Sequence, residues 1–192
     1  MPRRKDAITT GKYYHVYNRG INHTRIFQSS RNYFFFINQL KNILIPTYAN
    51  MIAYVLMPTH FHFLVEVTSE DFSKGFGRFS NSYTKAFNIE QDRSGPLFES
   101  RFKAKSIEKD DYILALSRYI HLNPVKANLV NKPEDWPWSS YPDILGQRAG
   151  NLPKTDFLLN YFSGGQPERK YQDFVDSELP QVDQKIQFLN FE

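Results

Sequence analysis

The chain of 192 residues is 41% hydrophobic and 16% aromatic, which is enough apolar material for one sizeable core with a small addition. It contains no cysteine, which excludes disulfide frameworks and thiolate zinc sites, so any metal must bind to imidazole, carboxylate, amide or water. The net charge is only +4, but basic residues cluster in "PRRK" and "RFKAK", a pattern that suits a polyanion contacted in places.

Membrane insertion and secretion are not indicated. No apolar run has the length of a membrane span, and the basic N-terminus "MPRRKDAITTGKYY" is not followed by the apolar stretch of a signal peptide. We therefore expect a cytoplasmic protein without a membrane partner.

Hydrophobic periodicity predicts seven elements in the first two thirds of the chain. In chain order they are a strand at residues 12–20, a helix at 31–45, strands at 51–57 and 61–67, a helix at 70–88, a strand within 94–108 and a helix at 109–124. Pro46 and Pro124 are expected to end the first and third helices, and Pro58 lies in the turn of the central hairpin. The order β-α-β-β-α-β-α predicts an α+β fold, a ferredoxin-like antiparallel sheet with packed helices.

The pattern changes after the third helix. Tryptophan, proline and glycine interrupt the stretch "EDWPWSSYPDILG", and two short helices are expected at 156–162 and 167–179. We predict a catalytic domain at residues 1–145 and an appended helical segment at 146–192.

Two histidines in the second hairpin strand are the first candidate site residues. His60 and His62 alternate with Phe61 and Phe63, so both imidazoles lie on one face of the strand. Such a pair can supply two nitrogens to one cation, whereas two buried neutral imidazoles without partners cost free energy. Two structural histidines at a strand end are the alternative.

The third helix offers a nucleophile and a further ligand. Tyr119 and Asn123 are four residues apart and share one helical face, beside an apolar stripe of Ile113, Leu116 and Ile120. An amide oxygen with two imidazoles and open coordination positions suits Mg²⁺ or Mn²⁺, and a phenol one helical turn away can attack a phosphoryl group. The alternative is a core aromatic residue and a helix C-cap.

The same helical wheel directs three other side chains toward solvent, namely those of Ser117, Arg118 and His121. Tyr83 and Tyr112 are rival nucleophiles, but their neighbours four residues on are Phe87 and Leu116, which cannot bind a metal. Among these three tyrosines, only Tyr119 is paired with an oxygen ligand.

Several motifs together resemble those of a known family. The segments "YYHVYNRG", "AYVLMPTHFHFLVEV", "SYTKAFN", "GPLFESRFKAK", "YIHLNPVKANLV" and "WPWSSY" occur in order over about residues 13 to 141. In this respect the chain resembles the REP-associated tyrosine transposases, a branch of the single-tyrosine transposases in the HUH nuclease superfamily.

This resemblance implies a function. The His-hydrophobe-His motif falls on His60 and His62, and the family's tyrosine and amide ligand fall on Tyr119 and Asn123. It implies that these residues hold a divalent cation, Mg²⁺ or Mn²⁺, while the tyrosine attacks a DNA phosphodiester, leaving a 5′-phosphotyrosine and a free 3′-OH. Single-stranded or hairpin DNA from repetitive palindromic elements is the implied partner, and the protein is then associated with the nucleoid.

Further residues are candidates for DNA contact. Basic side chains track phosphates, and exposed aromatic rings, among which we also count Tyr141, stack on bases. The candidates are Arg3, Arg4, Arg101, Lys103, Lys105, Lys126, Trp136 and Trp138. Strand alternation places Arg101, Lys103 and Lys105 on one face. Ordinary packing of the two tryptophans against the domain is the alternative.

Two other functions stay open at this point. Ferredoxin-like sheets with aromatic and basic residues also form non-catalytic nucleic-acid-binding modules. A metal-dependent phosphoesterase that uses water would share the ligands but would not need Tyr119. The protein is expected to act as a monomer or a homodimer.

Overall fold

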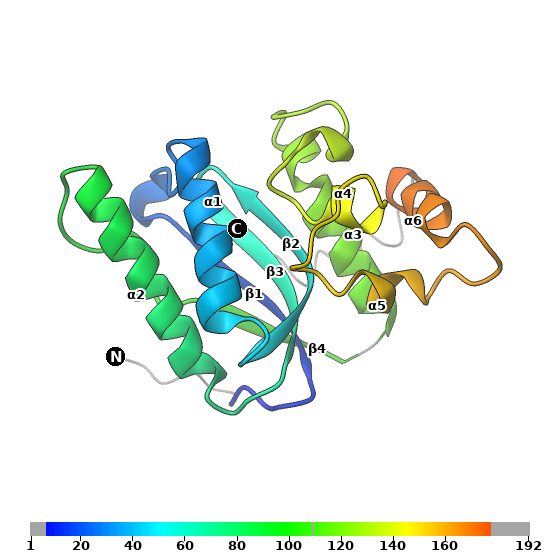
Figure 1. Cartoon of the computed structure of the whole chain (residues 1–192), viewed down its shortest axis with the longest axis horizontal. Coiled ribbons are helices and arrows are strands. Elements are labelled where there is room, and N and C mark those ends of the chain that lie inside the picture. The colour runs from blue at the N-terminus through cyan, green and yellow to red at the C-terminus, as the bar shows by residue number, and fades with distance from the viewer. Residues whose placement is uncertain (1–6, 109, 178–192) are drawn as a thin grey trace.

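The computed structural model describes residues 7–108 and 110–177 of the chain. A four-stranded sheet lies at its centre, with helices α1 and α2 on one face and α3 and the C-terminal helices on the other (Figure 1). The strands are β1 (Tyr13–Arg19), β2 (Ala49–Met57), β3 (His60–Val67) and β4 (Lys103–Ile107). The three main helices are α1 (Ser30–Gln39), α2 (Phe72–Glu90) and α3 (Asp110–Lys126).

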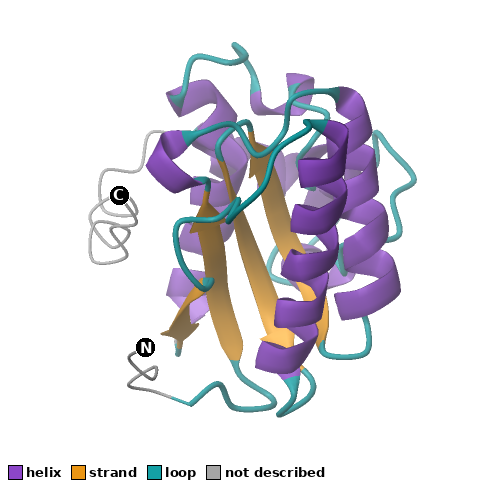
Figure 2. Ribbon diagram, turned by 90° about the vertical axis from the view of Figure 1, so that its left-hand side faces the viewer, coloured by secondary structure: helices purple, strands orange, loops and turns teal. Residues whose placement is uncertain are grey.

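The strands form one sheet in the order β2-β3-β1-β4, and every neighbouring pair is antiparallel. Figure 2 shows this sheet with helices packed against it. This order, with α1 between β1 and β2 and α2 between β3 and β4, is that of the ferredoxin-like split β-α-β arrangement. The predicted α+β fold and the predicted element order are therefore confirmed. Shorter helical turns, η1 (Ile21–His23), η2 (Leu40–Leu44) and η3 (Pro133–Asp135), lie in the connections.

The helix expected at 31–45 is divided. At its start, the side-chain oxygen of Asn32 accepts hydrogen bonds from the backbone N–H groups of Gln28 and Ser29 at 2.9 and 3.2 Å, which satisfies two donors that precede the helix. The α-helical part ends at Gln39, and a π-helical turn completes the segment before Pro46.

Alternation along β3 separates two cores. Phe61 and Phe63 are fully buried in the aromatic core beneath α1 and α2. Leu64 belongs to the second core, beneath α3, and His60 and His62 lie on its side of the sheet. The prediction that both imidazoles point to the same face is thus confirmed.

Helix α3 differs from the prediction at its end. Pro124 lies inside the helix, which continues to Lys126, and the N–H of Ala127 still donates to the Asn123 carbonyl at 2.9 Å. A proline within a helix removes one N–H donor, and the following turn is retained here by hydrogen bonds beyond it. The expectation that Pro124 ends this helix was wrong.

The expected solvent face of α3 is also wrong, because a second layer of chain covers it. Ser117, Arg118 and His121 are 0%, 6% and 0% exposed. The hydroxyl of Tyr171 donates to Ser117 Oγ at 3.0 Å and lies 2.7 Å from His121 Nδ1, while His121 Nε2 lies 2.8 Å from Ser140 Oγ. A helical wheel cannot anticipate this burial, since the covering residue Tyr171 is 54 positions from Ser117.

The covering layer is the C-terminal segment, with helices α4 (Tyr141–Ile144), α5 (Thr155–Leu159) and α6 (Pro167–Asp176). Leu158, Tyr171 and Val175 are fully buried in the same core as Leu64 of the sheet. The two helices expected at 156–162 and 167–179 correspond to α5 and α6, and the domain division at residue 145 stays a prediction.

Among the described helices, none has both the length and the hydropathy to cross a membrane.

The buried imidazole of His121 predicts a loss of stability in mild acid. Burial lowers the pKa of His121 to about 3, below its value of about 6.5 in an unfolded chain. As the pH falls from 7 to 5.5, the unfolded state therefore takes up the proton first, and this residue alone removes about 1 kcal/mol from the free energy of unfolding. Between pH 7 and 5.5, the free energy of unfolding measured in urea should fall by about 1 kcal/mol less for His121→Gln than for wild type. Equal decreases in the two proteins would contradict the lowered pKa of His121.

Candidate active site

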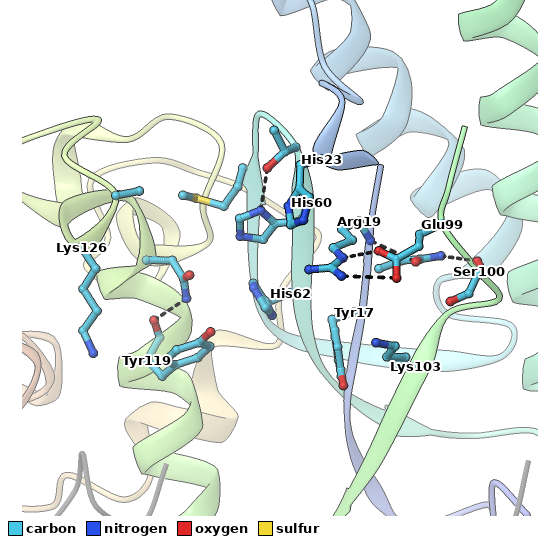
Figure 3. Close-up of a pocket in the computed structure, with 15 residues that line it drawn as sticks. Tyr17, Arg19, His23, His60, His62, Glu99, Ser100, Lys103, Tyr119 and Lys126 are labelled. Atoms are coloured by element: carbon cyan, nitrogen blue, oxygen red, sulfur yellow. Dashed lines mark hydrogen bonds and ion pairs between the residues drawn. The ribbon is translucent and has the colours of Figure 1, made fainter. Parts of the chain in front are cut away.

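A cavity of about 480 Å³ lies between the sheet and the C-terminal part of α3. Figure 3 shows Tyr119 and Lys126 reaching it from α3, and His60, His62 and Tyr17 from the strands opposite. Its lining residues are Tyr17, Asn18, Arg19, His23, Met57, Thr59, His60, His62, Glu99, Ser100, Lys103, Tyr119, Asn123, Lys126 and Ala127. All four residues predicted from the sequence to form the site are among them, although they come from two elements about 60 residues apart.

The two strand histidines meet at one wall of the cavity. The ring centroids of His60 and His62 are 5.0 Å apart, with the ring planes nearly perpendicular. His60 Nδ1 lies 2.9 Å from the Thr59 hydroxyl, and His62 Nδ1 lies 3.0 Å from His15 Nε2. Each imidazole thus uses its Nδ1 inside the protein, and Nε2 is the candidate ligand nitrogen.

Burial keeps these imidazoles neutral. It lowers the pKa of His60 to about 4, and the nearby Arg19 and His23 act in the same direction. Burial also lowers the pKa of His62 well below the usual range, with His15 and His60 as smaller causes. A neutral imidazole keeps the lone pair that a cation needs, so proton loss is not required for metal binding at neutral pH.

Helix α3 places Tyr119 and Asn123 against this wall. The Tyr119 ring lies edge-on to His62, with 5.5 Å between ring centroids. The side-chain amide of Asn123 donates from Nδ2 to the backbone carbonyl of Tyr119 at 2.8 Å. This bond holds the amide along the last turn of the helix and leaves Oδ1 as its ligand atom.

The remaining donor atoms suit a hard divalent cation. Two imidazole Nε2 atoms and one amide oxygen, from His60, His62 and Asn123, form an incomplete set that leaves positions for water or phosphate oxygen. Within residues 7–108 and 110–177, no group of three His, Cys, Asp or Glu side chains forms a metal site. A third protein ligand here has to be of another type, such as this amide.

Comparison with known proteins bears on the fold. No protein-family model matches the chain, and no curated protein matches it. A solved structure described as a REP-associated tyrosine transposase bound to a REP hairpin superposes with a TM-score of 0.61 at 19% sequence identity, covering 80% of this chain and 94% of that one. The chain has the fold of a REP-associated tyrosine transposase. The fold inferred from the resemblance is therefore confirmed.

Two basic residues lie beside the candidate active site. Lys126 Nζ lies 5.7 Å from the centroid of the Tyr119 ring, and Lys103 Nζ lies 5.8 Å from that of Tyr17. Both line the cavity, and Lys103 and Lys105 share the His62 face of the sheet because they pair with Tyr17 and His15 of β1.

The other predicted DNA contacts lie elsewhere. Arg101 precedes β4 in an exposed bend, so strand alternation does not set its direction. It instead lines a neighbouring groove between β4 and α2 that also contains Lys103 and Lys105. Arg3 and Arg4 lie outside the described residues.

Both tryptophans are partly buried, Trp138 against the α1 core and Trp136 against the cores on both faces of the sheet. Trp138 stacks on Tyr33 with 4.4 Å between ring centroids, and Trp136 Nε1 donates to the Leu56 carbonyl at 3.1 Å. Neither lines the candidate active-site cavity. Tyr141, expected to be exposed, is fully buried beside His121, because α4 closes over α3.

The structure also bears on the choice of nucleophile. Tyr83 is 1% exposed, packs in the α1 core on the other face, and donates its hydroxyl to the Ile26 carbonyl. It cannot reach the histidines. Tyr17 is an unexpected rival, since it lines the cavity and its ring centroid lies 5.9 Å from that of His62.

Sequence analysis thus missed two neighbours of His62 in the site region, His15 and Tyr17. Both lie in "YYHVYNRG", where alternation places them on one face of β1. Their relation to His62 depends on the pairing of β1 with β3, which no local pattern specifies.

These environments predict effects of different size on stability for two matched substitutions. Tyr83→Phe leaves a buried carbonyl without its donor and should lower the free energy of unfolding by about 1–2 kcal/mol. Tyr119→Phe changes a half-buried side chain at a cavity that water can enter, so its effect should be within about 0.5 kcal/mol. Urea unfolding of both variants at pH 7 tests this, and equal losses would place the two hydroxyls in similar surroundings.

Proposed function

We propose that the protein is a DNA transposase or endonuclease that cleaves and rejoins single-stranded or hairpin DNA through Tyr119. The observation that carries this proposal is the meeting of Tyr119, Asn123, His60 and His62 at one cavity. The fold shared with a structure described as a transposase bound to a REP hairpin supports hairpin DNA as the partner.

Tyr119 is the nucleophile in this proposal. Its phenol loses the proton to water or a base, the oxygen bonds to phosphorus, and the bond from phosphorus to the 3′-oxygen breaks. The products are a 5′-phosphotyrosine link and a DNA strand with a free 3′-OH. Because the phosphodiester energy is kept in the covalent link, attack by a 3′-OH reverses the step and joins strands without an external energy source.

His60, His62 and Asn123 are the proposed ligands of Mg²⁺ or Mn²⁺. When bound, such a cation polarises the phosphoryl group and stabilises charge that develops on its oxygens. The protein itself holds the imidazoles neutral and fixed by hydrogen bonds to Thr59 and His15. Lys126, beside the Tyr119 ring, is placed to contact the phosphate or the phenolate.

The decisive test is a covalent adduct. With Mn²⁺ and a single-stranded substrate that forms a hairpin, wild type should give a protein–DNA adduct that survives denaturing electrophoresis. Tyr119→Phe should give none, because it removes only the nucleophilic oxygen, while DNA binding persists. Tyr17→Phe is the matched control, since Tyr17 lines the same cavity, and it should still form the adduct.

Other outcomes point to other functions. Loss of the adduct in Tyr17→Phe but not in Tyr119→Phe would identify Tyr17 as the nucleophile. Metal-dependent cleavage by wild type without any adduct would indicate a phosphoesterase that uses water. Tight binding without cleavage would favour a non-catalytic nucleic-acid-binding module.

The basic residues around β4 predict the salt dependence of binding. Arg101, Lys103 and Lys105 line one groove next to the cavity, so replacing all three with glutamine should weaken binding of single-stranded DNA. For each phosphate that the protein no longer neutralises, the slope of log affinity against log salt should fall by about 0.7. Lys41→Gln, in the exposed part of η2, is the control and should leave the slope unchanged. An unchanged slope in the triple variant would exclude these side chains from the DNA path.

A further inference from the structure

A third histidine lies directly behind the proposed metal ligands. His15 is 0% exposed, and its Nε2 lies 3.0 Å from Nδ1 of His62. It is not among the residues that line the cavity. His15 therefore lies behind the cavity wall, and His62 is the lining residue within hydrogen-bond distance of its Nε2.

The orientation of His15 is set by aromatic rings packed around it. Its ring stacks on Tyr17, with centroids 4.8 Å apart and planes 19° from parallel, and on His62 at 5.1 Å and 17°. Tyr119 lies edge-on to it at 6.4 Å. This packing, on a β-strand in the middle of the sheet, leaves the imidazole little freedom to rotate.

The hydrogen bond has a consequence for the proton on His62. A neutral imidazole carries one N–H, and the nitrogen that binds a cation must be the other one. If His62 binds through Nε2, its proton is on Nδ1 and is donated to His15 Nε2, which accepts it. If His15 instead donates from Nε2, the proton of His62 moves to Nε2 and blocks the ligand atom.

We propose that His15 is a positioning residue that accepts the Nδ1 proton of His62 and so fixes the tautomer and ring orientation in which His62 Nε2 binds the catalytic cation. This inference rests on the proposed function, because it needs a cation at His62. Partners that accept the N–H of a metal-binding histidine typically change metal affinity 10- to 100-fold when they are removed.

The two proposed histidine ligands differ in this respect. The partner of His60 Nδ1 is the Thr59 hydroxyl, which can rotate to donate or accept and lies in a half-buried turn where water can replace it. A hydroxyl does not select one tautomer of the imidazole. Cation binding by His62 should therefore depend strongly on its hydrogen-bond partner inside the protein, and cation binding by His60 should depend on its partner only weakly.

The test measures Mn²⁺ binding by electron paramagnetic resonance with the full chain and no DNA. His15→Phe keeps a ring that can stack on Tyr17 but removes the acceptor, so Mn²⁺ affinity should fall 10- to 100-fold. His15→Gln restores an acceptor oxygen and should recover part of the loss. Thr59→Ala is the contrasting variant, because it removes a hydroxyl that does not select a tautomer of His60, and it should lower the affinity less than His15→Phe does.

A second readout does not depend on metal. Long-range ¹H–¹⁵N spectra of the wild-type protein should show His62 protonated on Nδ1, and the His15→Phe spectrum should show protonation shifted toward Nε2. Should His15→Phe fail to fold, as judged by circular dichroism, the wild-type tautomer and the His15→Gln affinity decide. Wild-type His62 protonated on Nε2 would overturn the inference.

The outcomes separate this inference from the proposed function. If wild type and Thr59→Ala bind no Mn²⁺, the proposed metal site fails and the role of His15 fails with it. If wild type binds Mn²⁺ and folded His15→Phe binds it equally well, only the role of His15 is refuted. If wild type binds Mn²⁺ and His15→Phe alone loses it, both are supported.

Discussion

The candidate site depends on the packing of Phe61 and Phe63 into the aromatic core on the far face of the sheet. The two rings stack on each other at 4.5 Å, and each lies within 6.3 Å of the Phe36 ring of α1. A shift of β3 by one residue would exchange its faces, turning the phenylalanines into the cavity and burying His60 and His62 in an apolar core. Exposing the two phenylalanines and burying the two histidines would each cost several kcal/mol. The apolar face of the strand therefore determines where the imidazoles lie.

The other half of the site depends on how α3 is held. Apolar packing on the sheet is not directional and would tolerate some rotation of the helix. The C-terminal segment adds directional contacts, since Arg118 donates to the backbone carbonyls of Val175 and Ser177, and His121 lies within hydrogen-bond distance of Tyr171 and Ser140. None of the described residues after Ala127 lines the cavity, yet this segment fixes the rotation that turns Tyr119 and Asn123 toward it.

These two constraints divide the chemistry between rigid elements. The strands supply imidazoles that burial keeps neutral, and beside buried groups interactions with a charged phosphate are stronger than in bulk water. The helix supplies a phenol and an amide one turn apart, and lysines at the rim supply positive charge. For the proposed reaction, a site built on strands and a helix rather than on loops would keep the reacting groups within the narrow range of geometry that covalent catalysis needs.

The sequence by itself determined which side chains share a face. Period-two alternation paired His60 with His62, a four-residue spacing paired Tyr119 with Asn123, and the order of elements predicted the sheet. Only the tertiary structure decided how these faces meet. The register of β1 against β3 brought His15 and Tyr17 beside His62, and the C-terminal segment buried the side of α3 that a helical wheel assigned to solvent. Local periodicity is set by the geometry of a single helix or strand, whereas register and coverage depend on packing between residues tens of positions apart, which no local pattern encodes.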